Sequence, residues 1–147
     1  MQAMVKSLAQ APEEQRRAML STRLDLFYGM SEVERKEAMK GMIQATAVLS
    51  VDELKNIART RARILAGFTT EKRNALMGTH MASLMELPMD RMAKDLNAMV
   101  AVMADLDEQQ RMAVMTTMKE LMMSLPEQQR NMMMGHLPEE ARRMMMG

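Results

Sequence analysis

The amino-acid sequence predicts an all-α protein, an array of about seven short antiparallel helices with no sheet, arranged as a solenoid or an irregular bundle. Two observations predict this class. The apolar residues follow the 3.6-residue period of helices that are buried along one face. Turn-forming or helix-capping residues also recur every 19 residues, at Pro12, Ser31, Ser50, Thr69, Pro88, Asp107 and Pro126. Equal spacing of this kind is typical of a structural repeat, so residues 1–147 are predicted to form a single helical-repeat domain.

The repeat unit is clearest in residues 107–125, DEQQRMAVMTTMKELMMSL. A helix rotates by about 100° per residue, so an apolar stripe forms along one face of this unit. The side chains within about 60° of Met118 are Val114, Met115, Leu121, Met122 and Leu125. An isolated helix of this length is marginally stable in water, so the stripe is predicted to pack against other helices. Met112 and Met123 lie outside the stripe, and we expect them to form a second surface that faces a partner.

The expected elements follow the boundaries in order. Residues 1–11 are predicted to be an N-terminal arm with an amphipathic opening helix, and a helix of about fifteen residues follows each boundary. Three boundaries carry a capping residue with Glu or Gln three positions later, at Ser31–Glu34, Ser50–Glu53 and Asp107–Gln110. After Pro126 the spacing shortens, because Pro138 follows twelve residues later, and this predicts two shorter helices at the end.

Arginine recurs at the fifth position of the unit, in Arg16, Arg35, Arg73, Arg111 and Arg130. In an antiparallel hairpin, the start of one helix lies beside the end of the previous helix. An arginine there can donate to the last carbonyls of the previous helix and offset the negative end of its dipole. We therefore interpret these arginines as structural.

Polar residues also occur at the twelfth position, in the middle of the apolar stripe. The residues there are Arg23, Met42, Arg61, His80, Met99 and Met118. An isolated charge is not buried without a partner, so Arg23 and Arg61 are candidate contacts for a carboxylate or phosphate. The alternative is that their stems pack while the guanidinium groups reach water. His80 is predicted to be a hydrogen-bonded core histidine.

Three further cations, Lys55, Arg59 and Arg63, line one face of the helix after Ser50. They are candidate contacts for lipid headgroups or an acidic protein subunit, and the ordinary alternative is a solvated face. The net charge of +1 indicates no general attraction to nucleic acid, and 2% aromatic residues do not favour binding of single strands.

Composition excludes several kinds of site. The chain has no cysteine, which excludes disulfides, thiolate metal sites and cysteine nucleophiles. It has no Gly-rich phosphate loop and no HExxH motif, and we predict neither an enzyme nor a cofactor. It also has no apolar run of the length that spans a membrane, and residues 1–11 lack the apolar region of a signal peptide. We expect a soluble or peripheral protein of unknown compartment.

Methionine dominates the apolar side chains, with 24 methionines against two phenylalanines and no tryptophan. Most of them lie from Pro88 onward, so we predict scaffold helices in residues 12–87 and a docking part in residues 88–147. The predicted partner-binding residues are Met112, Met123, Met132, Met133, Met134, Met144, Met145 and Met146. Methionine is flexible and suits irregular apolar contacts. The predicted function is a structural or assembly subunit that docks on apolar segments of a larger complex, with a photosynthetic or respiratory membrane assembly as one candidate.

Two alternatives remain open. An ATP-independent chaperone would hold exposed apolar segments of many clients on the same flexible surface. A Cu(I)-binding protein would use methionine and histidine as soft ligands. The candidate ligand sets are Met112, Met115, Met118 and Met122, or Met132 to Met134 with His136 and Met144 to Met146.

The unit openings LDEQQR, LPEQQR and LPEEAR resemble helix starts of the Spy-type periplasmic chaperones and of the N-terminal superhelix of MgtE-type magnesium transporters. The resemblance covers five or six residues in each copy and implies no site residue. In composition, the methionine-rich helices resemble the signal-sequence-binding M domain of signal recognition particle.

Overall fold

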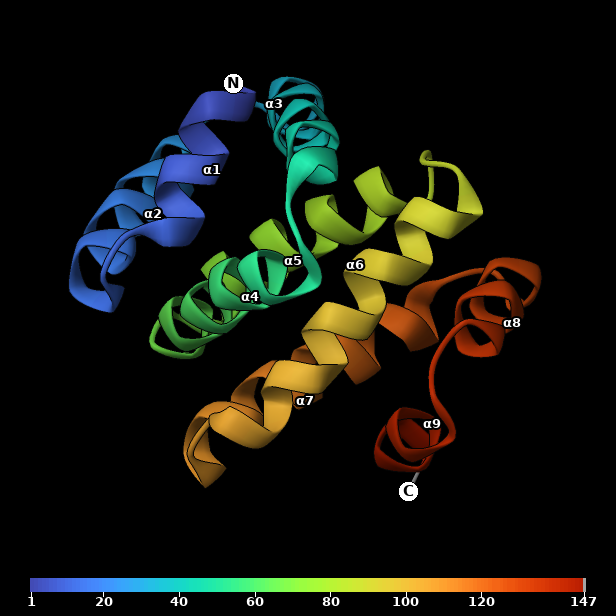
Figure 1. Ribbon diagram of the computed structural model, residues 1–147. Helices are drawn as coiled ribbons and strands as arrows, with labels where there is room; N and C mark the ends of the chain where they lie inside the picture. Colours follow the sequence, from blue (N-terminus) through green and yellow to red (C-terminus); the bar gives the residue numbers. More distant parts are fainter. Residues whose placement is uncertain (147) are drawn as a thin grey trace.

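The computed structural model describes the backbone of residues 1–146 and the side chains of residues 1–139 and 141–143. In this part of the chain all regular structure is helical, with nine α-helices and two short 3₁₀ segments. Figure 1 shows α1 beside α2 at the blue end of the chain, and α8 and α9 at the red end. The all-α class is confirmed. The described helices exceed the predicted total of about seven, because the opening helix and the two shorter helices expected at the end add to the six longer helices, α2 to α7.

The helices are α1 Gln2–Gln10, α2 Glu13–Tyr28, α3 Glu32–Ala45, α4 Val51–Ala66, α5 Thr70–Leu84, α6 Met89–Val102, α7 Glu108–Ser124, α8 Glu127–Gly135 and α9 Glu139–Met146. The 3₁₀ segments, Thr46–Val48 and Met103–Asp105, extend the ends of α3 and α6.

The N-caps of α2 to α8 lie at the seven predicted boundary residues. Ser31, Ser50, Thr69 and Asp107 each accept a hydrogen bond from the backbone N–H three residues later. At Ser50 and Asp107 the reciprocal side-chain bond also forms, which completes the capping box. Local sequence therefore determines where each helix begins.

The fifth-position arginines cap the ends of the preceding helices, as their position predicts. Arg73, which is 8% exposed, donates to the carbonyls of Leu65, Ala66 and Phe68 at 3.4, 3.4 and 3.0 Å. Equivalent bonds run from Arg16 to Ala9 and Ala11, from Arg35 to Phe27, Tyr28 and Met30, and from Arg111 to Met103 and Leu106. Among the described residues no such bond forms at Arg130.

Helices two apart in the chain make the most extensive contacts, which the hairpin model did not predict. α2, α4 and α6 form one row, and α3, α5 and α7 form a second row against it. Hydrogen bonds to threonines connect helices within each row. Three fifth-position arginines each donate to the threonine 44 residues later. These pairs are Arg16–Thr60 at 2.9 Å, Arg35–Thr79 at 3.3 Å and Arg73–Thr117 at 3.0 Å.

The core extends through both rows and across residue 88, the predicted division between scaffold and docking part. The larger cluster joins Val5 and Leu8 of α1 to Val114 and Met118 of α7. The smaller cluster joins residues of α3 and α5 to α6, α7, α8 and the start of α9. α1 is part of this core, since Val5, Leu8 and Ala9 are at most 1% exposed.

Candidate functional site

The predicted docking methionines occupy three different environments. Met112 and Met123 are 63% and 69% exposed. Since they are eleven residues apart on α7, helix geometry puts them on the same face, about 16 Å from each other. These two side chains are available to a partner.

Met133 is only 2% exposed and packs in the smaller core cluster, so its assignment to a docking surface is wrong. Met132 and Met134 are partly buried against the same cluster. The side chains of Met144, Met145 and Met146 lie outside the described residues, although their backbone belongs to α9. The eighth position of other units holds the buried residues Ile57, Leu76 and Val114 but also Met19, which is 38% exposed, so register alone does not determine the burial of Met133.

An open groove of about 370 Å³ lies between α5 and the end of α7. It is lined by Met81, Met85, Leu121 and Leu125 together with the polar residues Lys36, Glu86, Ser124 and Gln129. Leu121 and Leu125 lie within two residues of Met123 in the chain, but two residues correspond to about 200° of rotation, so the groove and the exposed methionines lie on opposite faces of α7.

The predicted anionic contacts on α4 are partly used within the fold. Arg59 pairs with Asp105 at 2.9 Å, and Arg63 pairs with Glu13 at 2.9 Å. The paired arginines are therefore structural, and an external anion would have to compete with Asp105 and Glu13.

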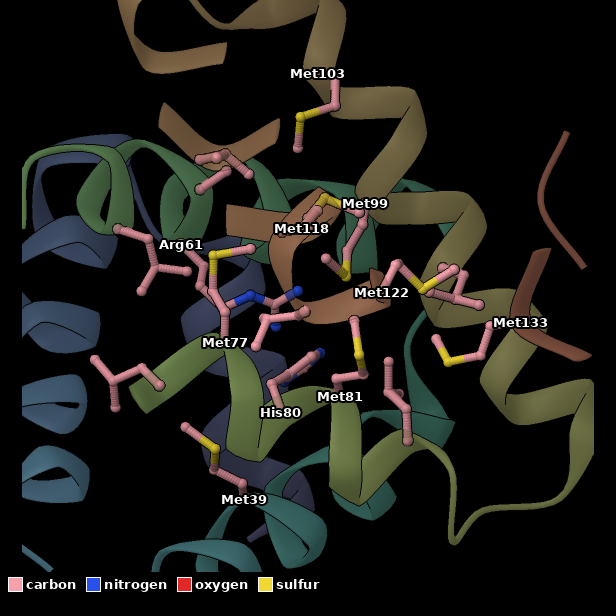
Figure 2. A pocket seen from close by; sticks show the side chains of 18 of the residues that line it. Met39, Arg61, Met77, His80, Met81, Met99, Met103, Met118, Met122 and Met133 are labelled. Carbon is pink, nitrogen blue, oxygen red and sulfur yellow. The ribbon is translucent and has the colours of Figure 1, made fainter. Parts of the chain in front are cut away.

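Arg61, at the centre of α4, is partly exposed. It lies between two adjoining cavities of about 60 and 40 Å³ that also share Leu24, Met39 and His80. Figure 2 shows the Arg61 guanidinium and the His80 ring in the middle of the larger cavity, surrounded by methionine side chains. Among the described side chains, none forms an ion pair or hydrogen bond with this guanidinium. Arg23 lines the smaller cavity and makes a 3.7 Å contact with the sulfur of Met4.

His80 is hydrogen-bonded within the core, as predicted. Its Nε2 lies 3.1 Å from Oδ2 of Asp95, and the two side chains are 12% and 7% exposed. Burial, together with the positive charge of Arg61, lowers the pKa of His80 below its usual value. Burial alone would raise the pKa of Asp95, but the hydrogen bond with His80 and the charges of Arg61 and Arg91 lower it overall. At neutral pH the pair is therefore a neutral imidazole that donates Nε2–H to an aspartate.

Asp95 was not predicted, although the sequence contains a signal for it. It occupies the eighth position of its unit, which holds Ala38, Ile57, Leu76, Val114 and Met133 in other units. A single carboxylate in an otherwise apolar column indicates a buried polar group with partners inside the fold.

The first Cu(I) ligand set does not converge. Met118 and Met122 are 6% and 5% exposed and face inward, whereas Met112 on the same helix is 63% exposed and points outward. In the described part of the chain no three His, Cys, Asp or Glu residues are grouped to hold a metal ion. None of the described helices is long and apolar enough to cross a membrane.

No protein-family model, curated protein sequence or solved structure matches this chain. The resemblances of the unit openings thus have no support in an overall match.

Proposed function

We propose that this chain is a non-catalytic assembly subunit that docks onto an apolar segment of another protein through α7. The observation that carries the proposal is the exposure of Met112 and Met123 on one face of a helix whose opposite face is packed in the core. Large apolar side chains grouped on a surface mark interaction sites, because each remains in contact with water until a partner covers it.

On the opposite side of α7, the groove between this helix and α5 is a second candidate contact for an apolar segment. It combines methionine and leucine side chains with polar ones, as protein interfaces do. The mobile thioethers of Met81 and Met85 adapt to the shape of an apolar side chain at low cost.

The test is a double variant, Met112→Ser with Met123→Ser, compared with the single variant Met89→Ser. Met89 on α6 is 52% exposed and lies outside the proposed surface, so Met89→Ser shows the effect of replacing an exposed methionine elsewhere on the protein. Partners are captured from native extract and identified by mass spectrometry, and the melting temperature of each variant is measured separately. We expect the double variant to lose a stoichiometric partner with an unchanged melting temperature, while Met89→Ser retains it.

Retention of every partner by the double variant would refute the proposal. The chaperone alternative predicts a different result, namely suppression of aggregation for several unrelated clients without a stoichiometric partner. Co-sedimentation of the wild type with membranes, lost in the double variant, would place the partner in a membrane assembly.

A further inference from the structure

The charges around the two interior cavities are unbalanced. Among the residues that line them and the small adjoining pocket, the cations are Arg23, Arg61, Arg91 and Lys94, and the only carboxylate is Asp95. Arg91 and Lys94 donate to the carbonyls of Ile43 and Leu49, and Asp95 is bonded to His80. Arg23 and Arg61 are both partly exposed, and they give this region an excess of positive charge.

Arg61 differs from the structural arginines in what it contacts. Arg73 is bonded to three carbonyls and a threonine, whereas no described side chain or carbonyl accepts a hydrogen bond from Arg61. A guanidinium has five N–H donors, and none of those of Arg61 is used by a described residue. Because Arg61 is partly exposed, these donors can bond to water or to an anion that enters the cavities.

The surroundings of Arg61 suit an aliphatic chain. The larger cavity is lined by leucine, alanine, valine and methionine side chains, and Met77, Met81, Met99, Met118 and Met122 surround it in Figure 2. Unbranched thioethers rotate readily, so the space can lengthen along the row of methionines. As observed, the larger cavity has room for about four water-sized groups, which corresponds to a short chain.

We propose that these cavities bind an aliphatic carboxylate, with its head group on the Arg61 guanidinium and its chain among the methionines of the larger cavity. Arg61 lies at the junction of the two spaces, so the head group meets its guanidinium while the chain extends into the larger cavity. Asp95, the carboxylate that lines the smaller cavity, is bonded to His80. Arg23 in the smaller cavity adds a second positive charge on the side of the head group.

The charge of Arg61 also separates this proposal from binding of Cu(I). The methionine sulfurs around the larger cavity are soft ligands, but a metal cation among them would lie beside a fixed guanidinium. Like charges repel strongly in a medium of low dielectric constant, and the same guanidinium attracts an anion. The cavity therefore favours an anion over a soft cation.

The experiment measures binding to the purified full chain by calorimetry and by thermal shift. The probes are straight-chain carboxylates from butanoate to dodecanoate, with octanol and octylamine as neutral and cationic controls. The variants are Arg61→Met, which keeps the apolar volume and removes the charge, and Arg61→Lys, which keeps the charge. Arg59→Met, in which the lost charge belongs to the ion pair with Asp105, is the matched control.

We expect one or more carboxylates to bind and raise the melting temperature, with octanol and octylamine binding more weakly than octanoate. Arg61→Met should weaken carboxylate binding about tenfold or more, since a charge-assisted hydrogen bond contributes that much. Arg61→Lys should retain part of the wild-type affinity for the carboxylate, and Arg59→Met should retain all of it. These measurements need no partner protein, so their outcome is independent of the docking proposal.

Three results would overturn the inference. One is the absence of binding by any carboxylate in the series, and another is equal binding to Arg61→Met and wild type. The third is binding of Ag(I), a stable substitute for Cu(I), more tightly than any carboxylate and without change in Arg61→Met.

Discussion

The same substitution at two arginines, Arg73→Met and Arg61→Met, should have opposite consequences for stability. Arg73 is 8% exposed and makes its two shortest bonds, 3.0 Å each, to the Phe68 carbonyl and the Thr117 hydroxyl. Each bond from a charged donor contributes about 1.5 to 3 kcal/mol, so losing both should lower the free energy of unfolding by about 3 to 6 kcal/mol. For a chain of this size, that corresponds to roughly 6 to 24 °C in melting temperature.

Arg61→Met removes a charge that has no partner among the described residues and adds an apolar side chain to an apolar cavity. We expect the free energy of unfolding to stay within about 1 kcal/mol of wild type or to rise. Urea denaturation with a common slope measures both changes. A loss below about 1 kcal/mol for Arg73→Met would refute the capping role, and equal losses at both sites would make Arg61 structural.

Three further predictions follow from burial, titration and backbone. Met133→Ala should cost about 2 to 5 kcal/mol, because Met133 is 2% exposed, whereas Met123→Ala should change stability by less than about 0.5 kcal/mol in urea denaturation. Because the pKa of His80 is lowered from its ordinary 6.5, the unfolded chain takes up this proton first as pH falls. The stability that neutral His80 contributes should therefore be fully present above pH 6.5 and be lost as the pH falls below it. Thermal melting of wild type and His80→Gln from neutral to mildly acidic pH should show a smaller decrease in melting temperature for the variant. Gly41→Ala should raise the free energy of unfolding by about 0.4 to 1 kcal/mol and raise the melting temperature, because Gly41 is inside α3 and an added Cβ would meet no atom within 4 Å. A lower melting temperature would show that the added methyl group is not accommodated.

Local features of the fold could be predicted because they depend on residues close in the sequence. A cap acts on the N–H groups of the next turn, and a fifth-position arginine reaches the carbonyls just before its own helix. Which helices would lie side by side could not be predicted from periodicity, because a stripe of Leu and Met fits any other such stripe. The threonines at the eleventh position, Thr60, Thr79 and Thr117, were the available signal for contacts between helices two apart.

The candidate site was predictable in part for the same reason. Arg61 and His80 could be found because a polar residue stands out in the middle of an apolar stripe. The environment of each methionine could not be read from composition, since Met132, Met133 and Met134 are chemically identical neighbours. Their burial depends on how α8 is rotated against the core, where Met133 is buried and Met132 and Met134 are partly buried.

Packing between helices two apart makes the fold sensitive to whether units are added or removed singly or in pairs. Deleting one whole unit would move every later helix into the opposite row, and each arginine there would face a new set of neighbours. Deleting two units would return each helix to its own row with its contacts of the same kind. The smallest change in length that preserves this architecture is therefore a pair of helices, even though the sequence repeats after one.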